Sequence, residues 1–114
     1  MEELKLKTKI EDFIKYMYIA LRQFPKSERF TLAADIKRSL FNLLELVIRC
    51  NFSRDKTKYF LDIDTELEIL KTKIRLSKDL EFLPFKKYEI CCQYLTEIGK
   101  IFGGWSKKFR GKAV

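Results

Sequence analysis

Histidine is absent from this 114-residue sequence, and glycine, proline and cysteine are scarce. The four Gly and two Pro are too few for a turn-rich β-sandwich, a collagen-like chain or a low-complexity chain. Without histidine, the mixed Cys/His ligand sets of structural zinc sites are missing, and the adjacent Cys91 and Cys92 lack the C-x-x-C spacing that lets two thiolates converge on one ion. We therefore expect no metal site and no cofactor.

Long apolar runs and a disulfide framework are also missing. Three cysteines are an odd count, which argues against paired disulfides. Uninterrupted apolar runs are only a few residues long, far below the roughly 20 residues that span a bilayer. The sequence opens with Met1, Glu2 and Glu3 rather than with an apolar targeting segment. These features predict a soluble, cytoplasmic protein that has no membrane partner.

Apolar and basic residues dominate what is present. Apolar side chains make up 46% of the chain and include ten Phe, so one domain can bury a core. Lys and Arg number 24 against 16 Asp and Glu, which gives a formal net charge of +8. A basic excess of this size favours a polyanionic partner.

Apolar residues recur every three or four positions in four stretches, which is the period of an amphipathic helix. The predicted helices cover residues 9–24, 27–50, 55–80 and 85–102. The side chains expected to face the core are Ile10, Phe13, Ile14, Met17, Leu21, Phe24, Ala33, Ile36, Leu40, Leu43, Leu44, Val47, Ile48, Phe60, Ile63, Leu67, Leu70, Ile74, Leu80, Tyr88, Cys91 or Cys92, Leu95, Ile98 and Phe102. No stretch alternates strictly between apolar and polar residues, so no strand is predicted.

Helix-breaking residues stand between these stretches. Pro25 follows the first helix, Pro84 follows the third, and the pair Gly103-Gly104 is expected to end the fourth. Four helices with short connections predict an all-α fold, an antiparallel up-down four-helix bundle over residues 1–105. A basic tail over residues 106–114 is expected to follow it.

The third predicted helix carries acids in its first half and bases in its second, an order that the helix macrodipole favours. Ser53 or Asp55 is expected to cap this helix by accepting hydrogen bonds from its free amides. Alternate residues on a helix lie about 200° apart, so its acidic run cannot surround one cation and is interpreted as a solvated surface. That run is Asp62, Asp64, Glu66 and Glu68.

No catalytic arrangement is recognisable in the sequence. It has no Gly-rich phosphate loop and no known nucleophile motif, and without histidine acid–base chemistry would rest on carboxylates, Lys or Cys. We interpret Cys91 and Cys92 as small core residues, with a nucleophilic cysteine as the rival hypothesis. No catalytic residue is predicted.

Cations gather in two regions. Residues 100–114 contain five Lys and Arg and no acid, and Trp105 and Phe109 lie among them, which suits phosphate contacts with base stacking. A second basic stripe is expected on the third helix, beside Lys and Arg of the second. The alternative for both regions is a solvated helix surface. The candidate nucleic-acid-binding residues are Lys37, Arg38, Lys71, Lys73, Arg75, Lys78, Lys100, Lys107, Lys108, Arg110 and Lys112.

Aromatic residues are more numerous than a slender bundle core needs, with ten Phe, five Tyr and one Trp. Four tyrosines, Tyr16, Tyr18, Tyr59 and Tyr94, lie near or off the inward-facing stripes. Because large amphipathic rings are favoured at interfaces, we expect some of them to pack against another subunit.

Several segments between residues 24 and 105 are distinctive, and the most specific is the ending Glu-Ile-Gly-x-x-x-Gly-Gly-Trp. They are Phe24–Leu32, Asp35–Arg38, Asp64–Leu67, Arg75–Leu80 and Glu97–Trp105. Together they resemble the accessory variability determinant (Avd) proteins of diversity-generating retroelements. The opening Phe-Pro-x-x-Glu-Arg pattern is shared with the four-helix proteins encoded in ribosomal RNA intervening sequences. That group typically has a Pro-containing segment where Phe41–Arg49 stands here, so the Avd branch is favoured.

The resemblance implies a four-helix bundle that assembles into a basic homopentameric barrel. It also implies binding to the retroelement reverse transcriptase and to RNA and DNA, in support of mutagenic copying of a template RNA, without a catalytic centre. The candidate residues in matched segments are Lys37, Arg38, Arg75, Lys78 and Lys100. The other six rest on charge alone, and a protein-interaction module for acidic partners is the rival function.

Overall fold

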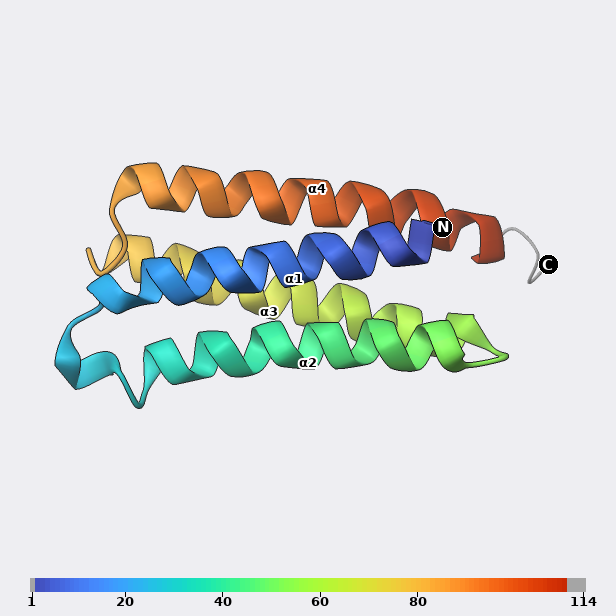
Figure 1. The fold of residues 1–114 in the computed structure, drawn as a ribbon, viewed down its shortest axis with the longest axis horizontal. Helices are drawn as coiled ribbons and strands as arrows, with labels where there is room; N and C mark the ends of the chain where they lie inside the picture. Colours follow the sequence, from blue (N-terminus) through green and yellow to red (C-terminus); the bar gives the residue numbers. More distant parts are fainter. Residues whose placement is uncertain (1, 111–114) are drawn as a thin grey trace.

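Four α-helices form the molecule in a computed structural model that describes residues 2–110. They lie side by side and alternate in direction, so the arrangement is an up-down bundle about 48 Å long (Figure 1). The helix α1 packs against α2 and α4, and α3 packs against the same two helices. The helices are α1 (Glu2–Ala20), α2 (Leu32–Phe52), α3 (Phe60–Asp79) and α4 (Phe85–Arg110), with the short 3-10 helices η1 (Leu21–Gln23), η2 (Lys26–Glu28) and η3 (Lys56–Tyr59) in the connections. The predicted four-helix, all-α class is confirmed, and no strand occurs within residues 2–110.

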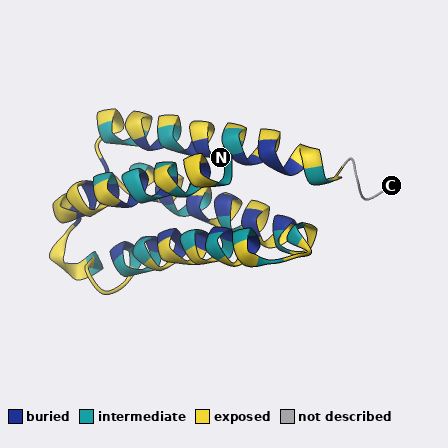
Figure 2. Ribbon diagram, turned by 45° about the vertical axis from the view of Figure 1, so that its right-hand side comes forward, coloured by how far each residue is buried: buried dark blue, intermediate teal, exposed yellow. Residues whose placement is uncertain are grey.

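The core runs along the bundle axis, where the apolar stripes of the four helices meet (Figure 2). The predicted inward residues are buried or half-buried, with one exception. Leu80 is 55% exposed because α3 ends at Asp79 and the chain turns through Glu81, whose φ is 65°. Leu83, which is 2% exposed, enters the core in its place.

The connection between α2 and α3 differs from the predicted cap. The hydroxyl of Ser53 donates to the Asp55 carbonyl oxygen, and the Asp55 carboxylate accepts from the Thr57 hydroxyl at 2.7 Å, so neither side chain caps a helix. Instead, the Lys56 ammonium donates to the carbonyl oxygens of Cys50, Asn51 and Ser53 at 2.9–3.3 Å. A cation thus satisfies the free carbonyls at the end of α2.

The predicted end of the fourth helix at Gly103-Gly104 is wrong, because α4 continues to Arg110. Beyond the pair, Trp105 and Phe109 pack on Phe60 with ring centroids 5.7 and 6.3 Å away. Two mid-helix glycines cost about 1 kcal/mol each, whereas burying one large apolar side chain contributes about 1.5–3 kcal/mol. Aromatic burial therefore carries the helix past the glycines, and residues 106–110 of the predicted tail belong to α4.

Three of the four tyrosines, some of which were expected at a subunit interface, pack within the bundle. Tyr94 stacks on Phe13 at 5.1 Å and lies 5.7 Å from Tyr16, and Tyr59 is also half-buried against the core. Tyr18 is 41% exposed. Burial raises the pKa of Tyr16. The aromatic side chains that remain exposed are Tyr18, Phe30, Phe41, Phe52 and Phe85.

In the part of the chain that the structure describes, no helix has an apolar stretch long enough to cross a membrane. Within residues 2–110, no three Cys, Asp or Glu side chains are placed to hold one metal ion.

Candidate nucleic-acid interface

A groove between α3 and α4 carries the first set of predicted cations. Lys71 and Arg75, one helical turn apart on α3, line it together with Tyr88 from α4. The Lys78 ammonium lies 4.9 Å from the centre of the Tyr88 ring, a cation–π contact that extends the row by another turn. The structure thus places Lys71, Arg75 and Lys78 in one row. We call the groove lined by Lys71, Arg75 and Tyr88, with Lys78 beside it, the α3/α4 groove.

The charge of this groove is only partly neutralised by the protein. Lys78 pairs with Asp79 at 3.2 Å, but neither Lys71 nor Arg75 forms an ion pair with any residue in 2–110. One carboxylate, that of Glu68, lies among the residues that line the groove. Two exposed cations therefore remain to attract an external anion.

The cysteines beside the groove differ in environment. Cys91 is fully buried and its thiol donates to the sulfur of Met17 at 3.3 Å. Burial raises the pKa of Cys91 to about 12, which keeps the thiol protonated at neutral pH and argues against a nucleophilic role. Cys92 lines the groove, and a hydrogen bond with Cys92 raises the pKa of Tyr88. Tyr88 thus adds no negative charge at neutral pH.

The predicted cations on α2, and Lys73 on the side of α3 that faces α2, lie in different environments. Lys37 lies 4.5 Å above the Tyr18 ring, and Arg38 pairs with Asp35. Lys73 points away from the α3/α4 groove and donates to the Ser39 hydroxyl at 2.8 Å. Lys73 is therefore a contact between α3 and α2, and the structure does not bring it to the other α3 cations.

The cations near the C-terminus are divided between contact with the bundle and exposure. Lys108 pairs with Glu2 at 2.8 Å, and Arg110 pairs with Asp64 at 3.1 Å. Lys100 and Lys107 are exposed and form no ion pair with another described residue. Lys112 lies outside the described residues.

The expectation that Trp105 stacks on nucleic-acid bases is wrong. Its ring is 3% exposed and lies 5.7 Å from Phe60 and 6.2 Å from Phe102. The prediction failed because it rested on a helix that ends at the preceding glycine.

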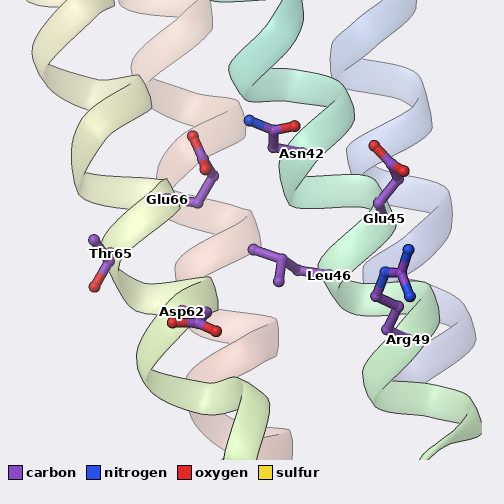
Figure 3. A pocket seen from close by; sticks show the side chains of 7 residues that line it. All are labelled: Asn42, Glu45, Leu46, Arg49, Asp62, Thr65 and Glu66. Carbon is purple, nitrogen blue, oxygen red and sulfur yellow. The ribbon is translucent and has the colours of Figure 1, made fainter.

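Negative charge collects in a different groove, between α2 and α3 (Figure 3). Glu45 projects there from α2, and Asp62 and Glu66 project from the first half of α3. Arg49 is the one cation among the residues that line it. The two halves of α3 thus contribute to grooves of opposite charge, a negative one beside α2 and a positive one beside α4.

Sequence reasoning missed two cations, Arg22 in η1 and Arg29 after η2. Both line a further groove, together with Lys37. They lie on separate elements, so no spacing along one helix could have grouped them, although Arg29 belongs to the distinctive segment Phe24–Leu32.

Fold and surface together define a class: a four-helix bundle that presents a cationic groove on one pair of helices. A protein-family model described as bAvd-like matches residues 4–109. The chain therefore belongs to the bAvd-like family, which confirms the family that the sequence segments indicated. No match was found among the curated proteins.

Proposed function

We propose that this chain is a non-catalytic accessory protein of a diversity-generating retroelement. In this role it binds template RNA or its cDNA, and the retroelement reverse transcriptase, and so supports mutagenic reverse transcription. Membership of the bAvd-like family supports the retroelement assignment. The observation that carries the binding role is the α3/α4 groove, where Lys71 and Arg75 have no carboxylate partner among residues 2–110.

Binding through this groove is mainly electrostatic. Lys and Arg on a helix surface contact phosphates, and such contacts carry affinity without sequence information. Lys78 extends the row toward the end of α3, and the nearby Tyr88 ring offers a surface beside it. We therefore expect weak sequence preference and strong dependence on salt.

Assembly into a homopentamer is part of the proposal. The side of α3 away from the core carries the apolar residues Leu61, Ile69 and Leu76, which are 75%, 39% and 44% exposed, and Leu80, directly after the helix, is 55% exposed. A stripe of this kind supports contact between subunits. An oligomer would present several α3/α4 grooves to one polyanion and increase affinity through multivalency.

Charge reversal tests the binding role. The variant Lys71→Glu/Arg75→Glu should weaken binding of a structured RNA at least tenfold in fluorescence anisotropy, because two phosphate contacts become repulsions. A matched control is Lys15→Glu/Arg54→Glu, which changes the net charge equally at exposed cations away from the groove. The same pair of variants should separate in co-purification with the reverse transcriptase.

The rival function, a module for acidic protein partners, predicts a different outcome. In that case RNA and heparin would fail to displace the partner, and wild-type protein would bind RNA no better than the groove variant. Equal RNA affinity of the groove variant and its control would overturn the proposed function.

A further inference from the structure

A second cationic groove lies at the end of the bundle where α1 gives way to α2. Arg22 from η1, Arg29 from the turn after η2, and Lys37 from α2 line it together. None of the residues that line it is acidic. None of the three cations forms an ion pair with another residue in 2–110. Three like charges thus converge without a counter-charge from the described part of the chain.

The fold holds these cations in place by apolar contacts. Phe24, which is 7% exposed, packs on Phe82 with ring centroids 5.9 Å apart and fixes the extended segment before Pro25. The Tyr18 ring lies 4.5 Å from the Lys37 ammonium and contacts Phe41 edge-on. The cation–π contact positions Lys37 at the groove without neutralising its charge.

Two carboxylates close in sequence to the lining residues, Glu28 and Asp35, have other partners in the described chain, and only that of Asp35 is paired with a cation. Glu28 accepts the hydroxyl of Thr31 at 2.7 Å, and Asp35 pairs with Arg38. Ala33, in the first turn of α2, also lines the groove, so the positive end of that helix adds to the same field. The local potential is therefore positive from several independent sources.

We propose that this groove, lined by Arg22, Arg29 and Lys37, binds a phosphate group of a polynucleotide. The inference rests on the proposed function and adds a second point of attachment to it. Arg22 and Arg29 are exposed, so a lone phosphate would be poorly enclosed, whereas an extended polyanion can gain from two sites at once.

The two cationic grooves are linked at this end of the bundle. Gln23, directly after Arg22, lines a depression together with Lys78, the last cation of the α3/α4 row, and Glu81 is the acidic residue among those that line it. A single-stranded polynucleotide that lies along Lys71, Arg75 and Lys78 can therefore continue to the groove lined by Arg22. The backbone phosphates can then be held on both sides of the depression.

The test compares two variants that each lose one Arg and one Lys. Arg29→Gln/Lys37→Gln removes two cations of the groove, and Arg54→Gln/Lys58→Gln removes two exposed cations at the opposite end of the bundle. The control is matched in chemistry as well as charge, because Lys58 lies 5.2 Å above the Tyr59 ring as Lys37 lies above Tyr18. Circular dichroism and light scattering check that both variants keep the fold and assembly of the wild type.

Binding of a fluorescein-labelled oligouridylate is measured across a salt series. The groove variant should bind about tenfold more weakly than the wild type near physiological salt, and the slope of log affinity against log salt should become shallower by about 1.4, the loss of two single-strand phosphate contacts. The control should stay within about twofold of the wild type. Equal affinity of groove variant and control would overturn the inference.

A second arm uses inorganic pyrophosphate with backbone-amide NMR. Displacement of pyrophosphate from the amides around Arg29 by the oligouridylate supports a polynucleotide occupant. Pyrophosphate that stays bound in excess RNA would overturn it in favour of a free phosphate ligand. If Lys71→Glu/Arg75→Glu weakens RNA binding and Arg29→Gln/Lys37→Gln does not, the inference alone fails. If wild-type protein binds no RNA, the proposed function fails with it.

Discussion

Replacement of the glycine pair in α4 tests the most unexpected feature of the fold. Gly103 and Gly104 are exposed, their φ angles are not positive, and a Cβ atom added at either position meets nothing within 4 Å. Alanine therefore fits both sites without strain. Because Gly is about 1 kcal/mol less favourable than Ala in a helix interior, Gly103→Ala/Gly104→Ala should raise the free energy of unfolding by roughly 1.5–2 kcal/mol.

Urea unfolding followed by circular dichroism measures this gain. With an m-value of about 1–3 kcal/mol per molar urea, the midpoint should rise by roughly 1 M at equal protein concentration. Gln93→Ala, at an exposed position of the same helix, is the control and should change stability by less than about 0.5 kcal/mol. Unchanged or lower stability of the double variant would refute a helix that runs through the glycines to Arg110.

Three further predictions concern single residues. Lys73→Met removes the 2.8 Å hydrogen bond to Ser39 and should lower the free energy of unfolding by about 1–2 kcal/mol, while RNA affinity measured by anisotropy stays within about twofold. A large loss of RNA affinity with unchanged stability would contradict the role of Lys73 as a contact between α3 and α2. The raised pKa of Cys91 means that the folded state holds the thiol proton more tightly than the unfolded state. The free energy of unfolding should therefore fall as pH rises from about 9 toward 12, by up to about 1.4 kcal/mol per pH unit. Cys91→Ala should show a shallower fall in urea unfolding measured across this pH range, and an identical slope would count against the buried thiol. Phe60→Ala removes the ring that Phe102, Trp105 and Phe109 contact and should lower the free energy of unfolding, measured by heat or urea, by about 3–5 kcal/mol. A loss below about 1 kcal/mol would exclude a packed aromatic cluster.

The periodicity of apolar residues was sufficient to predict four helices and most of the core. It missed the first turns of α1, which begins at Glu2 rather than at residue 9, and the buried residues Leu6, Ala20, Cys50, Leu83 and Trp105. The features that it predicted depend on contacts that repeat along one helix, as the burial of Ile63, Leu67, Leu70 and Ile74 illustrates. The end of α4 could not be predicted in this way. It depends on Phe60, 45 residues or so away from Trp105 in sequence, and a long-range aromatic contact outweighs the local preference of glycine.

In the candidate site, too, the features set by spacing along one helix could be predicted, and those set by contacts between helices could not. The spacing of Lys71, Arg75 and Lys78 predicts their shared side of α3. In the structure Lys71 and Arg75 line one groove, and Lys78 lies beside it against the Tyr88 ring. The pairing of Arg110 with Asp64 depends on which helices are neighbours, as does the inward turn of Lys73, and neither is encoded in local spacing. The same reason explains why Arg22 and Arg29 went unnoticed in the sequence.

The dependence of wild-type RNA affinity on salt measures the central claim most directly. If Lys71, Arg75 and Lys78 each neutralise one phosphate, these three contacts contribute a slope of log affinity against log salt of about −2 for a single strand and near −2.7 for a duplex, per engaged subunit. Engagement of Arg29 and Lys37 as well makes the single-strand slope steeper by about 1.4. A flat salt response, or no RNA binding at low salt, would contradict a protein that acts by holding polyanions on an exposed cationic surface.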